Sequence, residues 1–421
     1  MALKLKFKGP VPCAECGFTP VFHGIERWAL TFEEVLGLFM PLSRALSPAI
    51  VLANRLVDAL GTPALKFLAL TGLATVTQRP DARDTETTQC LWDEAQARGI
   101  EMRQFRPFDL RRNIFSASFN GDSRLFISMP RPNRFSPALL WMDHKPNMKR
   151  RFARAGFPVP RGATCVTERG ALRALRALTP PVITKPHSGS GGRHTTLNMS
   201  DEASLRAGFR SARRLSPLVV VEEQMRGPLF RVTLIDRTLV AVLRRDPPTV
   251  TGNGHRTIRE LVEIENANPL RAGPIFAKIS LTDPAVHAEL ARQGFSWDTV
   301  LSPGQAALLH FKVNWGVGGI SYDVTGEVHP ANRDLFNEIG AYLDDPIVGI
   351  DFIIEDIGKP WYDQRRCGVI ECNSMPFIGN HHYPFRGPAR NVAASVWDLI
   401  FPASRLSKNE KSPAGARDHR A

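Results

Sequence analysis

The stretch VITKPHSGSGGRH, residues 182–194, joins a short apolar run to a glycine-rich loop. The apolar run predicts a buried strand that carries Lys185, and Gly189, Gly191 and Gly192 follow it at once. Glycines allow backbone N–H groups to turn toward a phosphate, and a lysine adds a positive charge beside it. The order differs from that of a Walker loop, in which the lysine follows the glycines. The pattern indicates a phosphate-binding loop, with an ordinary surface turn as the alternative.

Two apolar runs nearer the C-terminus carry carboxylates. GIDFIIED contains Asp351, and GVIECNSMP contains Glu371 and Asn373. Both runs predict central β-strands, and Glu371 and Asn373 share one face because strand side chains alternate with a period of two. Buried carboxylates need a cation, and such oxygen ligands suit magnesium accompanied by nucleotide phosphates. Surface carboxylates at strand ends are the alternative.

Arginines mark a further pair of predicted strands. LFRVTLID, residues 229–236, and TLVAVLRRD, residues 238–246, predict a hairpin that places Arg231 and Arg244 on adjacent strands. Guanidinium groups there are expected to bind phosphoryl oxygens or a substrate carboxylate in bidentate fashion. For Arg245 a surface salt bridge is the preferred interpretation.

The chain divides into four segments by pattern and composition. A helix from Thr87 to Arg98 and a hairpin around Asn120-Gly121 predict a small α/β lobe, because Asn-Gly favours tight hairpin turns. The last segment has little apolar content and is expected to be disordered. The predicted units are a helical N-terminal region (1–80), the small α/β lobe (81–143), a larger α/β domain (144–400) and the tail (401–421).

One short motif lies close to the N-terminus. Cys13 and Cys16 form a single CxxC pair with His23 nearby. No second cysteine pair follows at the spacing of a zinc finger. A structured turn is therefore preferred over a metal or redox site.

Composition limits the class of protein. Of the 421 residues, 43% are hydrophobic and 23% charged, which is typical of a soluble globular protein. The net charge of +13 is compatible with a nucleic-acid or membrane partner and equally with an enzyme that handles ATP and carboxylates. Nucleic-acid binding is disfavoured, because the chain has no purely basic run with interleaved aromatic residues. We expect a cytoplasmic protein without a membrane partner, because a signal-peptide core and an uninterrupted apolar span are both missing and the cysteines are scattered. Whether copies associate into a homo-oligomer is left open.

In order and spacing, these segments resemble the ATP-grasp superfamily, above all the ATP-grasp module of cyanophycin synthetase and of bifunctional glutathione-synthesising enzymes. The similarity runs over roughly residues 142–387. It implies an α/β (α+β) ATP-grasp fold in which two α/β lobes clasp ATP, preceded by a small α/β N-terminal domain and a helical leader. The stretches that carry it include KRRFARAGFPVP (149–160), NWGVGGISYDVTGEVHP (314–330) and RRDPPTVTGNGHRTIRELV (244–262), and the last is far more specific than a glycine loop.

The resemblance implies a ligase that uses ATP and Mg²⁺, as one or two ions with Mn²⁺ as the alternative ion. Such an enzyme joins a carboxylate to an amine through an acylphosphate, with amino acids or peptides as substrates. Two other classes stay open: a kinase that phosphorylates a small molecule without ligation, and an inactive binding or scaffold protein. The scaffold interpretation is disfavoured because the lysines and carboxylates of the pattern are intact.

The resemblance also implies roles for single residues. For the nucleotide these are Lys145 and Lys185 at the phosphates, Ser190, Gly191 and Gly192 over the β- and γ-phosphates, and Glu222, Glu223 and Met225 along the adenine edge. For the reaction they are Asp351, Glu371 and Asn373 as magnesium ligands, and Arg231 and Arg244 at the acylphosphate.

Two features depart from the family pattern or stay undecided. Leu229 occupies a position where relatives often place an acidic residue that holds the ribose, so ribose contact is open. His381 and His382 are expected either to line the substrate pocket or to have a structural role.

Overall fold

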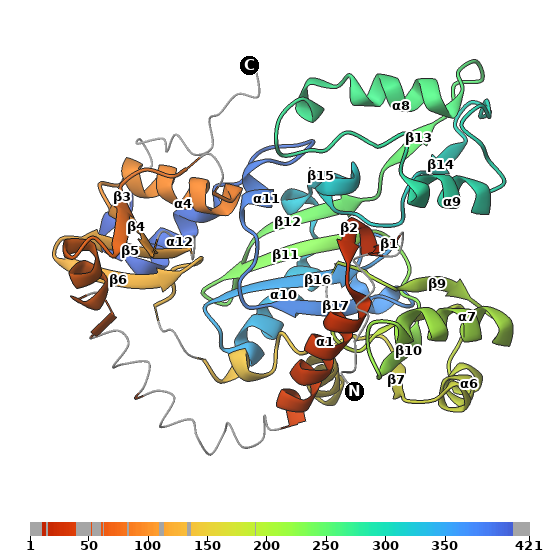
Figure 1. The fold of residues 1–421 in the computed structure, drawn as a ribbon, viewed down its shortest axis with the longest axis horizontal. Helices are drawn as coiled ribbons and strands as arrows, with labels where there is room; N and C mark the ends of the chain where they lie inside the picture. The colour runs from red at the N-terminus through yellow and green to blue at the C-terminus, as the bar shows by residue number, and fades with distance from the viewer. Residues whose placement is uncertain are drawn as a thin grey trace, which may run out of the picture.

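The computed structural model is shown in Figure 1 as a set of antiparallel sheets covered by helices. Ser190 and the end of the tail lie outside the described residues. No helix within the described part of the chain is long and apolar enough to cross a membrane. The described residues are 11–13, 16–38, 52, 60–61, 63–81, 84–108, 113–132, 136–189 and 191–406.

The N-terminal region contains a β-hairpin as well as helix. Strand β1 (Val11–Cys13) pairs antiparallel with β2 (Gly17–Val21), and α1 (His23–Leu38) follows. The sequence predicted only helices in residues 1–80, which is incomplete, because these strands are too short to show an alternating pattern. A further strand, β3 (Ala74–Thr77), also lies in this range.

The small lobe is a four-stranded antiparallel sheet in the order β3-β4-β5-β6. Its hairpin turns at Asn120 and Gly121, which have φ of 50° and 85°, as the Asn-Gly signal predicted. One face of the sheet shares a core with the C-terminal helix, in which the Trp397 indole donates to the carbonyl of Leu91 at 2.8 Å. The lobe therefore includes residues beyond the predicted range 81–143. Its elements are β4 (Glu101–Pro107), β5 (Ile114–Phe119), β6 (Asp122–Ile127), α4 (Glu86–Ala97) and α12 (Val392–Ile400).

The second sheet carries the glycine-rich loop and has the order β7-β10-β8-β9. Helices α6 and α7 pack on one face around a core that includes Leu172, Leu205 and Phe209. Both helices begin at a capping side chain, Thr167 and Asp201, whose oxygens accept backbone N–H bonds. The elements are β7 (Gly162–Cys165), α6 (Glu168–Ala177), β8 (Val182–Pro186), β9 (Thr196–Met199), α7 (Glu202–Arg213) and β10 (Val219–Glu223).

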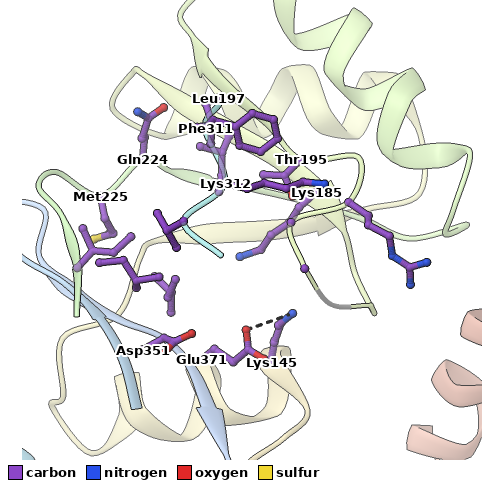
Figure 2. Close-up of a pocket in the computed structure, with 18 of the residues that line it drawn as sticks. Lys145, Lys185, Thr195, Leu197, Gln224, Met225, Phe311, Lys312, Asp351 and Glu371 are labelled. Atoms are coloured by element: carbon purple, nitrogen blue, oxygen red, sulfur yellow. Dashed lines mark ion pairs between the residues drawn. The ribbon is translucent and has the colours of Figure 1, made fainter. Parts of the chain in front are cut away.

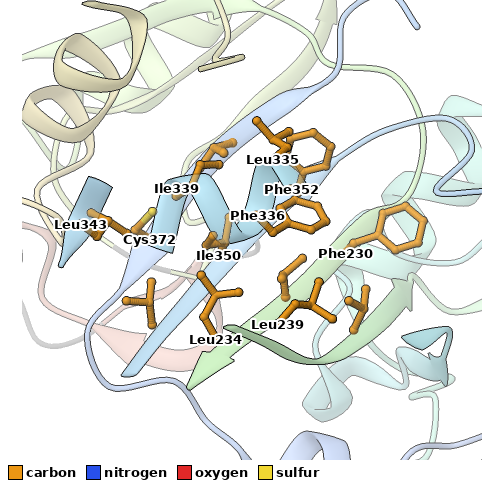
Figure 3. Packing of buried hydrophobic residues seen from close by; sticks show 14 of the residues in the cluster. Phe230, Leu234, Leu239, Leu335, Phe336, Ile339, Leu343, Ile350, Phe352 and Cys372 are labelled. Atoms are coloured by element: carbon orange, nitrogen blue, oxygen red, sulfur yellow. The ribbon is translucent and has the colours of Figure 1, made fainter. Parts of the chain in front are cut away.

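The third sheet is five-stranded and antiparallel, in the order β15-β12-β11-β16-β17. Helix α10 covers one face, and Figure 3 shows its Phe336 beside Phe230 and Phe352 of the strands. Strand β17 is an edge strand and not a central one, and α5 packs against it. The elements are β11 (Leu229–Ile235), β12 (Thr238–Asp246), β15 (Ile320–Asp323), α10 (Pro330–Leu343), β16 (Ile347–Ile353), β17 (Gly368–Asn373) and α5 (Lys145–Arg154).

A small unit with its own core is inserted after β12. Its first helix begins with a capping box between Thr257 and Glu260, within the long segment that carried the resemblance. The unit contains β13 (Thr249–Thr251), α8 (Ile258–Asn266), α9 (Pro284–Arg292) and β14 (Ala306–Leu308). The remaining elements are α11 (Gly379–His382) and short 3₁₀ helices at Pro137–Leu140, Pro269–Arg271, Trp315–Val317, Thr325–Glu327, Trp361–Asp363 and Pro402–Ser404.

Candidate active site

A pocket of about 620 Å³ lies between the second and third sheets. Figure 2 shows Lys185 and Gln224 on one side of it and Asp351 and Glu371 on the other. Residues that are far apart in the sequence therefore meet at one site. Side chains of β8, β10, β11, β16 and β17 line the pocket, and the glycine-rich loop borders it.

Glu222 holds two lysines at one end of this pocket. Its carboxylate accepts from the ammonium groups of Lys185 and Lys149, each at 2.5 Å. Burial alone would raise the pKa of Glu222, but the two ammonium groups outweigh it and lower that pKa. Burial and the nearby Lys185 lower the pKa of Lys149. The Glu222 side chain thus positions Lys185. Sequence reasoning did not assign this role to Glu222, and it did not identify Lys149 as a residue of the site.

Lys145 connects the glycine-rich loop to the third sheet. It is the first residue of α5, and its Nζ donates to the carbonyl of Gly189 at 2.6 Å. The same Nζ lies 3.5 Å from Glu371 Oε2, the contact dashed in Figure 2. Gly191 and Gly192 have φ of 70° and 64°, a region that favours glycine. The glycines therefore allow the loop a backbone conformation that other residues rarely adopt.

The carboxylates of the third sheet stand opposite each other. Asp351 of β16 is the register partner of Glu371 of β17, and both line the pocket. On the other side, Arg231 of β11 faces Asp351 and donates to its two oxygens at 2.5 and 3.1 Å. Burial opposes the charge on Arg231, but Asp351 outweighs it and raises the pKa of the guanidinium. Arg231 therefore orients the Asp351 carboxylate.

Asn373 lies two residues beyond Glu371, opposite Gly349. It is not among the residues that line the pocket. Its side-chain Nδ2 is buried and has no hydrogen-bond partner within the described chain. The two carboxylates thus converge on the pocket, and the buried amide stands behind them with unused hydrogen-bonding capacity.

Arg245 shares the pocket face with Arg231. Across the β11–β12 pair, Leu229 is opposite Arg245, so both side chains lie on the same side as Arg231. Arg245 lines the pocket, and its Nε is buried without a hydrogen-bond partner among the described residues. Burial and the charge of Arg231 lower its pKa. A cation in such surroundings is suited to an anionic ligand.

Arg244 points to the opposite face of the sheet, which corrects its expected place beside Arg231. It is the register partner of Phe230, not of Arg231. Its guanidinium pairs with Asp246 at 2.8 Å and lies 5.7 Å from the Tyr322 ring. The surface salt bridge expected for Arg245 is therefore made by Arg244. Neighbouring residues of a strand face opposite sides of the sheet, so only one of the two arginines can face the pocket. That residue is Arg245 and not Arg244.

The hinge after β10 forms the apolar side of the pocket. Glu223, Gln224 and Met225 line it, and the Glu223 carboxylate also accepts from the amide of Thr179 at 3.0 Å. Gly227 has a φ of 104°, and a Cβ there would lie 2.2 Å from the carbonyl oxygen of Ile354. Only glycine allows this close approach. Other apolar lining residues include Ile183, Leu197, Leu229, Ile353 and Ile370.

The charged lining is predominantly positive. Sequence reasoning assigned no role to Arg193, although it directly follows the glycines, and it missed Lys312, which lies in no recognisable phosphate motif. The excess of cations favours an anionic ligand. The cations are Lys145, Lys185, Arg193, Arg231, Arg245 and Lys312, against Glu222, Glu223, Asp351 and Glu371.

His381 and His382 have structural contacts and do not line this pocket. Both are buried in α11. The Nε2 of His381 lies 2.7 Å from Thr233 Oγ1, and the Nε2 of His382 accepts from the amide of Ala393 at 3.1 Å. Of the two interpretations left open, these contacts favour the structural one.

Two sheets that enclose a pocket, with Lys185 and Gln224 on one side and Asp351 and Glu371 on the other, form an ATP-grasp fold, as the sequence indicated. The chain is 36% identical over 270 residues to a cyanophycin synthetase from Geminocystis herdmanii, a match that covers 63% of this chain and 31% of that protein. It is 31% identical over 272 residues to a glutathione biosynthesis bifunctional protein from Mannheimia succiniciproducens, covering 62% and 36%. The chain therefore spans about a third of the length of these curated relatives.

A solved structure supports the fold independently. The bifunctional glutathione synthetase from Pasteurella multocida aligns with a TM-score of 0.56 at 24% identity, over 76% of this chain and 44% of that one. No known family model matches the sequence. The resemblance to cyanophycin synthetase and to bifunctional glutathione synthetase that the sequence predicted is confirmed.

Proposed function

We propose that this chain is an ATP- and magnesium-dependent ligase that joins a carboxylate to an amine through an acylphosphate. The observation that carries the proposal is the convergence of Lys145, Lys185, the glycine-rich loop, Asp351 and Glu371 on one pocket. A phosphate-binding side and a carboxylate side face each other there, as phosphoryl transfer from a metal-bound nucleotide requires. The relatives named cyanophycin synthetase and glutathione biosynthesis bifunctional protein support an amide-forming reaction.

The nucleotide is proposed to lie along β10 with its phosphates under the glycine-rich loop. The apolar lining around Met225 suits an adenine ring, and the amide of Met225 makes no backbone hydrogen bond among the described residues. Lys185 is held toward the pocket by Glu222, and Lys145 by the carbonyl of Gly189. These two ammonium groups are suited to the phosphate oxygens. The proposed role of Ser190 rests on its position in the loop alone.

Asp351 and Glu371 are proposed to hold magnesium, with Asn373 beside them. The donor set fits this ion, because two carboxylates oppose each other on one pocket face and Mg²⁺ prefers oxygen ligands. Arg231 uses one side of the Asp351 carboxylate, which still has lone pairs for a cation. When bound, the ion neutralises charge on the transferring phosphoryl group.

The proposed reaction has two steps. A substrate carboxylate oxygen attacks the γ-phosphorus and ADP leaves; an amine then attacks the acyl carbon and phosphate leaves with formation of the amide and release of a proton. Arg231 and Arg245 share one pocket face, and the acylphosphate is proposed to form there. We assign to Arg245, in place of Arg244, the stabilisation of the developing negative charge.

ADP release with panels of amino acids and short peptides, followed by mass spectrometry of the products, tests the proposal. The expected result is ADP formation that needs both a carboxylate and an amine, with a product lighter than the two substrates by one water. Amine-independent ADP formation with a stable phosphorylated product would establish a kinase. Nucleotide binding without any turnover over broad panels would favour a binding protein.

A further inference from the structure

Four potential metal ligands meet where the N-terminal segment contacts the glycine-rich loop. Cys13 ends β1, Cys16 precedes β2, and His23 begins α1, while His194 follows the loop at a distance of 171 residues or more in sequence. One ligand atom from each residue lies within 4.8 Å of the others. Two thiols and two imidazoles therefore face a common point.

Four distances between these atoms are close to those of a tetrahedral zinc site. Zn–S bonds of about 2.3 Å and Zn–N bonds of about 2.0–2.1 Å place S and N ligands about 3.6 Å apart and two N ligands about 3.4 Å apart. His194 Nε2 lies 3.6 Å from Cys13 Sγ and 3.2 Å from Cys16 Sγ. His23 Nε2 lies 3.5 Å from Cys16 Sγ and 3.2 Å from His194 Nε2. These four distances thus lie within about 0.4 Å of the values expected around one zinc ion.

The ring of His194 is oriented as a metal ligand requires. Its Nδ1 lies 3.0 Å from the carbonyl oxygen of Ser211 and 3.2 Å from the Ser211 hydroxyl, so Nδ1 carries the hydrogen that is donated to the carbonyl. The Nε2 is then left with its lone pair toward the cluster. His194 is buried with 1% exposure, and its φ of 51° turns the chain at this point.

The cluster ties the N-terminal segment to the loop that borders the pocket. Next to it, Glu26 of α1 pairs with Arg193 at 3.1 Å. One turn further along α1, Leu30 packs against Gly189, where an added Cβ would lie 3.6 Å from Leu30 Cδ1. The segment thus contacts both ends of the glycine-rich loop.

We propose that Cys13, Cys16, His23 and His194 bind one Zn²⁺, which fastens the N-terminal hairpin and α1 onto the glycine-rich loop. Two sulfur and two nitrogen ligands in tetrahedral arrangement select zinc. Four protein ligands leave no position for water, so the ion is structural and not catalytic. It stabilises the fold on this side of the pocket because zinc binding and folding of such a segment are coupled.

Metal analysis of the full chain, purified from zinc-supplemented cells without an affinity tag, tests the site. We expect one zinc per chain. Exchange with Co²⁺ is expected to give the visible bands of tetrahedral cobalt and a thiolate charge-transfer band. A chain without zinc whose cobalt spectrum lacks that band, or a Cys13–Cys16 disulfide found by mass spectrometry in reducing preparations, would overturn the proposal. This test uses the unaltered protein, so a variant that fails to fold does not affect it.

Variants assign the ligands. The double substitution Cys13→Ser with Cys16→Ser is expected to remove the zinc and the charge-transfer band. The matched control is Cys367→Ser, whose hydroxyl is expected to keep the bond that Cys367 makes to the Trp361 carbonyl at 3.2 Å. Equal zinc content in the double variant and in the control would contradict the assignment.

Hydrogen exchange tests the connection to the loop. In His23→Asn, amides of residues 187–194 are expected to exchange at least about tenfold faster than in the wild type, whereas those of residues 101–107 stay unchanged. Glu26→Gln is the control, since it removes only the ion pair to Arg193 and is expected to keep the zinc. Zinc loss in His23→Asn without faster exchange in the loop would refute the fastening role while leaving the metal site.

Discussion

Two groups of potential metal ligands flank the glycine-rich loop, and they differ in both chemistry and access. Asp351 and Glu371 are oxygen donors on neighbouring strands, and they face an open pocket. The cysteine–histidine cluster consists of sulfur and nitrogen donors that face one another. Oxygen donors with free positions suit an exchangeable magnesium, whereas a closed set of four suits a zinc that stays bound. The same loop is thus expected to lie between a metal that turns over with substrate and a metal that does not.

Treatment with a chelator is expected to give the largest difference between the pocket carboxylates and the cysteine–histidine cluster. Brief treatment with EDTA should abolish ADP release, and added Mg²⁺ should restore it, because the pocket ligands are accessible. The zinc content should stay constant in the same samples, because four protein ligands hold that ion. Metal analysis before and after treatment checks this. Zinc loss in parallel with activity, with recovery only on adding zinc, would show that the comparison is wrong.

Substitution of one pocket carboxylate is the next largest test. Glu371→Gln is expected to lower kcat/KM about 10²–10³-fold, because it removes a proposed magnesium ligand and the partner of Lys145. Thermal unfolding should change little, since the side chain is partly exposed at the pocket. Glu338→Gln, on the exposed side of α10, is the matched control. Wild-type turnover in Glu371→Gln would count against the assignment.

The two adjacent arginines of β12 provide a smaller, paired test. Arg245→Gln is expected to lower kcat/KM about 10²-fold, because it removes a partly buried charge from the pocket. Arg244→Gln should stay within about fivefold of wild type, because it loses only a half-exposed ion pair to Asp246. Steady-state ADP release by both variants decides between them. A larger loss in Arg244→Gln would restore the role first expected for that residue.

The smallest expected effect is on the free energy of unfolding at acid pH. It arises from buried histidines that belong neither to the pocket carboxylates nor to the cysteine–histidine cluster. Burial and then Lys312 lower the pKa of His310 to about 4, and burial and then Arg231 lower that of His381 to about 3. Between about pH 6.5 and pH 4 the unfolded chain therefore binds protons at these histidines that the folded chain does not, so stability falls as pH falls.

Denaturant unfolding across this pH range measures the effect. His310→Asn retains an acceptor for the amide of Lys312 and is expected to lower proton uptake on unfolding by about one. His255→Asn, at an exposed position, is the control. An unchanged pH dependence in His310→Asn would contradict the prediction.

The sequence predicted features that depend on residues close together along the chain, and it missed features that depend on contacts between distant segments. The strands that carry Lys185, Asp351 and Glu371 are local patterns, and so are helix α4 and the Asn-Gly hairpin, so all were found. Sequence reasoning missed Arg245, because choosing between two adjacent arginines requires the register with β11. It also missed Lys149, which faces Glu222 only after α5 packs near the sheet.

The cysteine–histidine cluster was beyond reach for the same reason. Cys13, Cys16 and His23 were visible as a motif, but the fourth member follows the glycine-rich loop 178 residues after Cys16. Spacing rules for zinc sites require all ligands within one short segment. Only the folded chain brings the fourth ligand to the other three.

Strand β11 has a consequence for how variants of this protein will be read. Leu229 and Arg231 face the pocket, while Phe230, Val232 and Leu234 face the core under α10. In a mutational scan that scores abundance and turnover separately, the even-numbered positions should lower the amount of protein and the first two odd-numbered positions its turnover per molecule. Within this one strand, substitutions at alternating positions would then affect either the stability of the fold or the activity of the pocket.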